Sequence, residues 1–366
     1  MKGLHSRRNL VLFLFAALFS GVVMSAGASY VAAAPSEQAG PRTWTVLVGG
    51  EAGITQQEGG PAGTWEFMRF YPDTITINEG DTIVWKLKSA EPHTVTFPQL
   101  GHMPPQLTVL EGGSSNRLLL NPLAVFPQGG NSYDGTNLTG SGQLDPGPQF
   151  PKEYSLTFPR GGTYQYFCAF HSMMSGKVVV QAAGSAYPKT QEQIDADAAA
   201  MLAADAAASS MFQPVADTET TRVGPTGNAI HEVRVGWGNG IMSYMRFGPT
   251  NLTIKKGDTV VFVLADVDTP HTVTFTPGGP DPELVLQEAQ PAGPPKLVLN
   301  PDVLNPAGTG TYSGTGYYNS GFMWGINTPI PGPRTYSLTF DTPGTFQYMC
   351  VLHDMMGMKG SITVQP

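Results

Sequence analysis

Short stretches of β-branched and aromatic residues, separated by turn-forming residues, recur along most of the chain. Residues 74–77 and 259–263 have the composition of strands, and residues 79–81 and 256–258 carry turn signals. These stretches do not alternate with long helical segments. The pattern therefore predicts an all-β fold, and we expect an antiparallel β-sandwich rather than an α/β protein.

The same pattern occurs twice along the chain. Four segments of the first half match four segments of the second half in the same order, namely 67–82 with 244–259, 92–97 with 270–275, 154–158 with 336–340 and 162–168 with 344–350. Self-similarity of this kind indicates a repeated structural unit. We therefore predict two tandem β-sandwich domains at residues 43–182 and 214–366, joined by a helical linker at residues 183–213.

The predicted linker contains an alanine-rich segment at residues 191–209 without glycine or proline. Thr190 and Gln193 have the spacing of a capping box, and Glu192 lies in the first turn, where the helix dipole favours an acid. We expect a helix over residues 191–209. Two interpretations remain open, because isolated alanine helices are marginal without packing: a solvated spacer, or an element that sets the distance between the domains.

Residues 1–34 have the pattern of an export signal. Basic residues precede an apolar run, and small residues follow, with candidate cleavage after Ala28 or Ala34. Residues 6–11, which contain two adjacent arginines, resemble a twin-arginine signal. Residues 10–34 carry no charge, so an uncleaved segment that spans a bilayer is the alternative. We expect a protein of the periplasm, the extracellular space or the cell surface, attached to a membrane only through this segment if at all.

The charge balance is acidic. The formal net charge is -8, and removal of residues 1–34, which hold three basic residues and no acid, would make it -11. Such a surface repels nucleic acid and favours a partner with a basic docking face, although solubility alone would also explain it.

The chain has two cysteines, Cys168 and Cys350, which occupy equivalent positions of the two repeats. A disulfide is the first expectation for two cysteines in an exported protein, but here it would join equivalent positions of separate domains. Each cysteine instead has a histidine far upstream, a histidine three residues downstream and a methionine just beyond. The candidate metal ligands are His93, Cys168, His171 and Met174 in the first repeat, and His271, Cys350, His353 and Met358 in the second, with Met356 as the alternative axial residue. One thiolate, two imidazoles and a weak thioether are the ligands of blue copper.

The loop pattern Cys-x2-His-xn-Met-x-Gly resembles that of the cupredoxins, the family of plastocyanin, amicyanin and auracyanin. The first repeat has the amicyanin-like loop with n of 2, and the second has the plastocyanin-like loop with n of 4. The resemblance implies Greek-key domains, two type 1 copper ions per chain that cycle between Cu(I) and Cu(II), redox proteins as partners, and electron transport without catalysis. It also implies that His171 and His353 lie near the surface as electron exits, and that Thr94 and Thr272 hold the cysteine sulfur through backbone hydrogen bonds.

Other sequence features bear on competing functions. No His-x-His occurs, and His102 and His231 are isolated, so we expect both at the surface and find no ligands for the catalytic coppers of oxidases or nitrite reductases. The alternative function is copper storage or delivery, which the additional methionines Met173, Met355 and Met356 would support through their affinity for Cu(I).

The spacing from the upstream histidine to the cysteine is 75 residues in the first repeat and 79 in the second, longer than in small cupredoxins. The extra residues include loops at 131–136 and 312–318. These loops either form a docking surface or cover the metal edge, or they are tolerated surface insertions.

Overall fold

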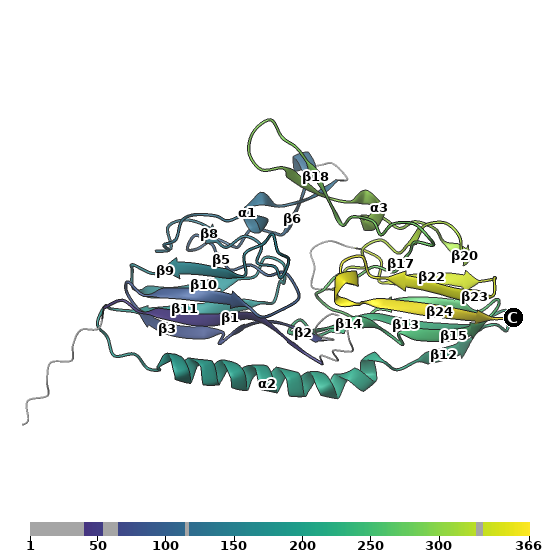
Figure 1. Ribbon diagram of the computed structural model, residues 1–366, viewed down its shortest axis with the longest axis horizontal. Coiled ribbons are helices and arrows are strands. Elements are labelled where there is room, and N and C mark those ends of the chain that lie inside the picture. The colour runs from purple at the N-terminus through teal and green to yellow at the C-terminus, as the bar shows by residue number, and fades with distance from the viewer. Residues whose placement is uncertain (1–39, 54–64, 114–116, 327–331) are drawn as a thin grey trace, which may run out of the picture. The chain divides into compact units, whose positions relative to one another are not determined.

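The computed structural model describes residues 40–366, except for residues 54–64, 114–116 and 327–331 (Figure 1). The predicted export signal at residues 1–34 lies outside the described residues. Within the described part of the chain, no helix has both the length and the apolar character needed to cross a membrane.

The first repeat is a sandwich of two sheets. One sheet has the strand order β2-β1-β4-β9, and the facing sheet has the order β3-β11-β10-β5-β8. The strands β1–β4 and β3–β11 pair in parallel, so the sheets are mixed and not purely antiparallel as expected. Aromatic side chains such as Trp85, Phe97 and Tyr166 fill the space between the sheets. The elements are β1 (Thr43–Ala52), β2 (Trp65–Tyr71), β3 (Thr74–Asn78), β4 (Thr82–Leu87), β5 (Thr96–Phe97), β6 (Thr108–Leu110), η1 (Glu111–Gly113), β7 (Leu118–Leu120), α1 (Pro122–Val125), β8 (Thr139–Gly140), β9 (Glu153–Thr157), β10 (Gly162–Phe167) and β11 (Ser175–Gln181).

The second repeat has the same architecture. Its sheets have the orders β14-β13-β16-β22-β20 and β15-β24-β23-β17-β21, and Phe262, Phe275 and Tyr348 lie in its core. The prediction of two tandem sandwiches is therefore confirmed. The elements are β12 (Thr220–Val223), β13 (Ala229–Gly238), β14 (Met242–Gly248), β15 (Asn251–Lys255), β16 (Thr259–Leu264), β17 (Thr274–Phe275), β18 (Val285–Glu288), β19 (Lys296–Leu299), α3 (Pro301–Leu304), β20 (Gly310–Tyr312), β21 (Tyr318–Asn319), β22 (Thr335–Phe340), β23 (Gly344–Met349), η2 (Asp354–Met356) and β24 (Lys359–Gln365).

The two repeats share one sheet. Strand β2 of the first repeat pairs antiparallel with β14 of the second, which joins one sheet of each repeat into a continuous ten-stranded sheet. Glu66 lies opposite Ser243 in this pairing, and the two residues occupy equivalent positions of the repeats. The pairing is therefore nearly symmetric, and it brings the same edge of each repeat together.

Helix α2 (Gln191–Ala216) connects the repeats and packs on both of them. It begins where predicted, with both hydrogen bonds of the capping box between Thr190 and Gln193, but it continues beyond Ser209. Packing explains the extension, because the Phe212 ring stacks on Trp237 of the second repeat with the ring centroids 4.6 Å apart. The helix lies along β1, β2, β13 and β14 (Figure 1). The solvated-spacer interpretation is therefore wrong.

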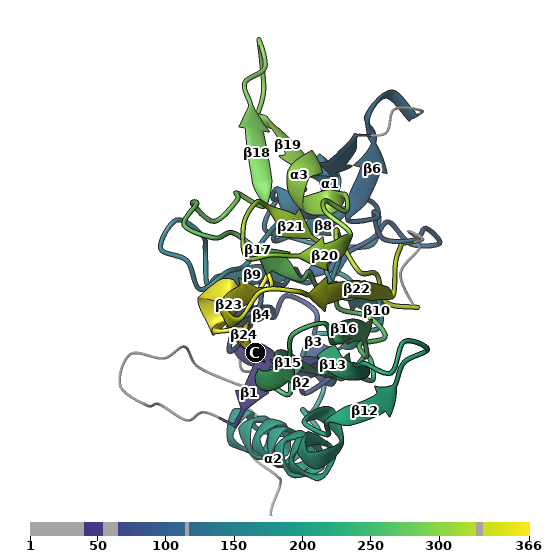
Figure 2. The same cartoon turned by 90° about the vertical axis from the view of Figure 1, so that its right-hand side faces the viewer.

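The inserted segments also join the repeats. The hairpin of β6 and β7 and the hairpin of β18 and β19 form a four-stranded sheet through the pairing of Leu119 with Val298 (Figure 2). Salt bridges flank this sheet. Arg117 lies 2.8 Å from the carboxylate of Glu111 in the first repeat and 2.5 Å from that of Glu288 in the second.

The loops at 131–136 and 312–318 each place one tyrosine in the core of their repeat. Tyr133 and Tyr312 are buried, and their rings pack on Phe97 and Phe275 with centroids 4.8 and 4.7 Å apart. Tyr133 and Tyr312 therefore complete the two cores, because burying a large aromatic ring stabilises the fold.

Candidate metal centres

Three side chains of the first repeat meet in a buried pocket. His93 follows β4, whereas Cys168 and His171 lie on the loop between β10 and β11. Cys168 Sγ is 3.8 Å from His93 Nδ1 and 3.5 Å from His171 Nδ1, and the two ring nitrogens are 3.1 Å apart. Sequence positions 75 residues apart are thus brought within reach of one ion.

The second repeat contains the same cluster. Cys350 Sγ is 3.8 Å from His271 Nδ1 and 3.4 Å from His353 Nδ1, and the ring nitrogens are 3.0 Å apart. All six side chains of the two clusters are buried. Both cysteines are free, so the disulfide alternative is wrong.

The spacing of these atoms fits a metal ion. In each cluster, the point equidistant from the three atoms lies about 2.0 Å from each of them, as follows from triangles with sides of 3.8, 3.5 and 3.1 Å and of 3.8, 3.4 and 3.0 Å. Imidazole and thiolate bind first-row metal ions at about 2.0 to 2.3 Å. The trigonal arrangement of one sulfur and two nitrogens is that of type 1 copper.

The two methionines predicted as axial residues occupy equivalent backbone positions. Cys168 N–H donates to Met174 O at 2.9 Å, and Cys350 N–H donates to Met358 O at 3.0 Å. The longer second loop accommodates its extra residues as the 3-10 turn η2. Met356 lies in this turn and packs with the core residues of the first repeat. The hydrogen-bond pattern therefore aligns Met358, not Met356, with Met174.

Backbone amides contact both cysteine sulfurs. Thr94 N–H donates to Cys168 Sγ and Thr272 N–H donates to Cys350 Sγ, both at 3.4 Å. Each threonine hydroxyl accepts a hydrogen bond from the backbone amide that follows the cysteine, at 2.7 Å in the first repeat and 2.9 Å in the second. These contacts hold the thiolate side of the pocket in place.

Two glycines that sequence reasoning missed make room for the upstream histidines. Gly49 and Gly236 lie at bulges of β1 and β13 with φ of 69° and 64°. A Cβ atom on Gly49 would lie 2.6 Å from His93 Nε2, and one on Gly236 would lie 2.4 Å from His271 Nε2. The repeated Val-Gly pair at 48–49 and 235–236 is the signal that could have identified them.

The surroundings of the first cluster favour neutral side chains. Burial lowers the pKa of His93 well below its usual value, lowers that of His171 to about 3 and raises that of Cys168 to about 11. His93 Nε2 lies 3.1 Å from the Ser89 hydroxyl, which in turn donates to Glu66 Oε2 at 2.6 Å. The Ser89 hydroxyl thus lies between His93 Nε2 and the carboxylate of Glu66.

In the second cluster a carboxylate faces the histidine directly. Asp266 Oδ2 lies 3.8 Å from His271 Nε2, and the Ser243 hydroxyl donates to the same carboxylate from behind. Burial opposes protonation of His271, but Asp266 and Cys350 outweigh it and raise its pKa to about 9. Burial likewise opposes ionisation of Cys350, but the adjacent positive charge of His353 and the contact with His271 lower the pKa of the thiol. Without metal, the second cluster therefore favours a thiolate beside imidazolium.

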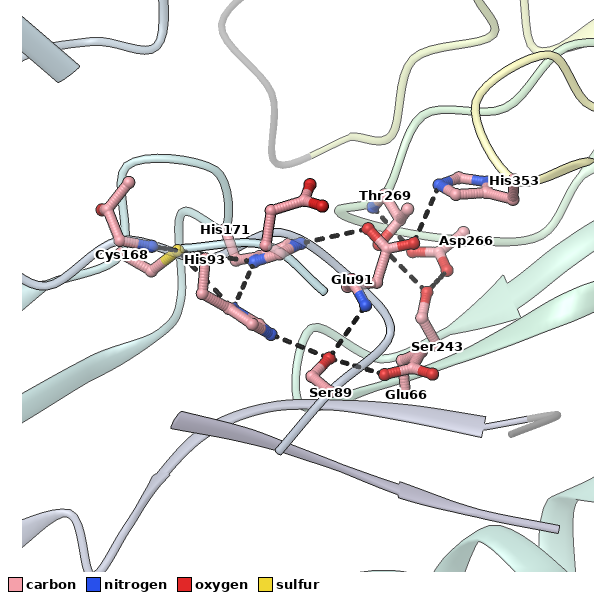
Figure 3. Close-up of polar contacts among 12 residues, drawn as sticks. Glu66, Ser89, Glu91, His93, Cys168, His171, Ser243, Asp266, Thr269 and His353 are labelled. Carbon is pink, nitrogen blue, oxygen red and sulfur yellow. Dashed lines mark hydrogen bonds and ion pairs between the residues drawn. The ribbon is translucent and has the colours of Figure 1, made fainter. Parts of the chain in front are cut away.

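A buried glutamate lies between the two clusters. Glu91 Oε1 is 3.4 Å from His353 Nε2, and Glu91 Oε2 is 4.0 Å from His171 Nε2 (Figure 3). His171 is 4% exposed and His353 is 3% exposed, so the expectation that both lie near the surface is wrong. The reason is that the shared sheet turns the metal-binding edge of each repeat toward the other.

The isolated histidines differ from each other. His102 is exposed as predicted, whereas His231 is buried, with Nε2 3.4 Å from Asp258 and Nδ1 3.1 Å from the Thr221 hydroxyl. Pairing with Asp258 offsets the cost of burying this ring. Within the described residues, the two Cys-His-His clusters are the groups of ligand-type side chains close enough to hold a metal ion.

Comparison with known proteins gives consistent results. The family model for copper binding proteins of the plastocyanin/azurin family matches residues 60–181 and 321–365. Plastocyanin of Scenedesmus fuscus is 32% identical over 123 residues, which cover 32% of this chain and 86% of that protein. Amicyanin of Paracoccus denitrificans is 28% identical over 116 residues, which cover 31% of this chain and 60% of that protein, less than two thirds of its length. A solved Cu(I) structure of an amicyanin variant is 21% identical with a TM-score of 0.21, and the match covers 38% of this chain and 82% of that chain. The identity with plastocyanin, over most of that protein's length, shows that the chain belongs to the plastocyanin/azurin family of copper-binding proteins.

Proposed function

We propose that this protein is an extracytoplasmic carrier of single electrons with two type 1 copper centres, one in each of two domains at residues 43–182 and 214–366. The observation that carries the proposal is the pair of buried triangles of one cysteine sulfur and two histidine nitrogens, which agree with each other to within 0.1 Å in every side. Two independent copies of one ligand geometry argue for two ions per chain.

The proposed ligands of the first centre are His93, Cys168, His171 and Met174, and those of the second are His271, Cys350, His353 and Met358. Copper would supply the one-electron chemistry by changing between Cu(I) and Cu(II). The protein contributes a rigid cage, because each upstream histidine is held against a β-bulge and each cysteine sulfur accepts a backbone N–H. A cage that does not rearrange allows an electron to enter or leave without moving the ligands.

The burial of the clusters supports a carrier rather than a protein that stores or delivers copper. A delivery site must exchange its ion with another protein and is therefore open, whereas all six cysteine and histidine side chains here are buried. One observation favours the delivery alternative, namely that Met355 is 83% exposed beside the second cluster and offers a soft ligand for Cu(I). An intense thiolate-to-Cu(II) absorption band is expected of a carrier and not of a delivery protein.

The proposed partners are redox proteins, with basic faces that complement the net charge of -8, and the proposed location is outside the cytoplasm. The pattern of residues 1–34 supports export, and the acidic composition supports the choice of partner.

Copper analysis combined with absorption spectroscopy tests the proposal. The wild-type protein should bind two copper ions and show thiolate bands from both centres, whereas Cys168→Ser and Cys350→Ser should each lose one ion and one band. Met355→Leu is the matched control and should keep both bands. Full retention of the spectrum in both cysteine variants, or copper binding without any thiolate band in the wild type, would contradict the proposal.

A further inference from the structure

Glu91 provides a short connection between the two centres. It is 5% exposed, and its two carboxylate oxygens face different repeats, one toward His171 Nε2 at 4.0 Å and the other toward His353 Nε2 at 3.4 Å (Figure 3). Both histidines point their Nδ1 atoms into the Cys-His-His clusters. The path from one cluster to the other therefore consists of two imidazole rings, one carboxylate and two short gaps.

The contact region around this path is held together by a part-buried hydrogen bond and by strand pairing between the repeats. Ser172, which follows His171, donates to Asp268 Oδ1 of the second repeat at 2.5 Å. Glu66 and Ser243 lie opposite each other where β2 pairs with β14. These contacts come from different elements. They therefore fix the separation of the two histidines more firmly than a single flexible loop would.

The charges around the two centres are not symmetric. The position equivalent to Glu91 is Thr269, so only one such carboxylate exists, and it lies closer to the second centre than to the first. The groups next to the upstream histidines also place more negative charge at the second centre, because His93 faces the Ser89 hydroxyl whereas His271 faces the Asp266 carboxylate. The second centre therefore has more negative charge next to its ligands.

We propose that the two centres form one directional relay, in which an electron passes from the second centre to the first across Glu91. This inference rests on the proposed function. With copper held by both clusters, one electron would leave Cu(I) in the second centre and reduce Cu(II) in the first, so the two ions would exchange oxidation states while no bond forms and no proton moves. A reduced one-electron donor protein then reloads the second centre, and an oxidised acceptor protein empties the first.

The direction follows from electrostatics. Nearby carboxylates stabilise the more highly charged Cu(II) ion relative to Cu(I), and they do so strongly in a buried site where water does not screen them. Asp266 and the nearer contact of Glu91 therefore lower the reduction potential of the second centre. In the first centre His93 faces the neutral hydroxyl of Ser89 instead of a carboxylate, so this centre holds the electron at equilibrium.

The equilibrium part of the proposal is tested by adding one electron per protein and locating it. The single-centre variants Cys168→Ser and Cys350→Ser assign the two thiolate bands, and in the half-reduced wild type the band of the first centre should be the one that disappears. Asp266→Asn should raise the potential of the second centre and shift the electron distribution toward it by about tenfold, which corresponds to 59 mV for one electron. Asp268→Asn is the matched control, because it removes a carboxylate from the same contact region. That carboxylate contacts Ser172 and no proposed ligand. Asp268→Asn should cause a smaller shift.

The pathway is tested by rapid photoreduction of the fully oxidised protein. After one electron enters, the wild type should show a redistribution between the two bands whose rate does not depend on protein concentration. Glu91→Ala removes the bridging atoms and should slow this phase at least tenfold, whereas Glu91→Gln keeps the bridge and should slow it less. Should Glu91→Ala lose copper, the wild type and Glu91→Gln still test the proposal.

The possible outcomes separate the two proposals. Absence of thiolate bands would refute the copper carrier itself. Two bands without a concentration-independent phase, or an electron that resides on the second centre in the half-reduced protein, would refute the relay and leave the carrier intact.

Discussion

Replacing Thr94 by valine removes one hydroxyl from the wall of the first centre while keeping the shape of the side chain. In the structure this hydroxyl accepts a hydrogen bond from Ala169 N–H at 2.7 Å and pairs with the Thr96 hydroxyl at 2.9 Å. Thr94→Val therefore leaves two polar groups without their partner. The backbone N–H of Thr94 still reaches the Cys168 sulfur, so the contact with the proposed ligand survives.

The second repeat offers a comparison at the equivalent position. Thr272→Val removes the acceptor of Val351 N–H, but the hydroxyl of Thr274 keeps a second partner, Asn319 Oδ1, at 3.0 Å. Each buried polar group that loses its partner costs about 1–3 kcal/mol. We expect Thr94→Val to lower the free energy of unfolding by about 2–6 kcal/mol and Thr272→Val by about 1–3 kcal/mol.

Urea unfolding of the metal-free protein, followed by tryptophan fluorescence, measures both losses. The double variant Thr94→Val/Thr96→Val replaces both hydroxyls by apolar groups and should recover part of the loss of Thr94→Val, because no hydroxyl is then left unpaired. Our reasoning would be refuted by a larger loss in Thr272→Val than in Thr94→Val, or by a double variant that is less stable than the single one.

Three further predictions concern other parts of the chain. Gly49→Ala should abolish copper binding at the first centre and spare the second, as measured by copper stoichiometry, because its Cβ would lie 2.6 Å from His93 Nε2 in a backbone with φ of 69°. Burial opposes ionisation of Asp258, but its hydrogen-bond donors outweigh burial and lower its pKa. The contribution of Asp258 to stability is therefore complete above the unfolded-state pKa of about 3.9, and it is lost as the pH falls through the lower folded-state pKa. The stability difference between wild type and Asp258→Asn in urea should therefore shrink between pH 7 and pH 3, and a constant difference would contradict this. Asp205→Ala should lower the free energy of unfolding by about 1.5–3 kcal/mol in the same urea assay, because the Tyr71 hydroxyl donates to this carboxylate at 2.6 Å and anchors α2 to the first repeat. An unchanged unfolding midpoint would show that the contact contributes nothing.

Local patterns determined much of the fold and of the metal-binding clusters. The strands, the repeat and the capping box at Thr190 all depend on residues close together in sequence, and the structure contains each of them. Cys168 and His171 lie on one short loop, so their proximity follows from spacing alone. The upstream His93 could be paired with that loop because its whole segment recurs before His271. Repetition within one chain thus supplied the evidence that a single domain would lack.

What the tertiary structure decided lies between the repeats. Glu66 and Ser243 face each other across the shared sheet, and Glu91 reaches the histidines of both repeats, yet no short-range pattern marks these residues as neighbours. Edge pairing of β2 with β14 sets these contacts, and it depends on backbone groups that every strand carries. The sequence by itself therefore determined which residues form each cluster, because those residues recur with the repeat. Only the assembled fold decided that the two clusters face each other, with His171 and His353 buried, because that arrangement arises from long-range packing.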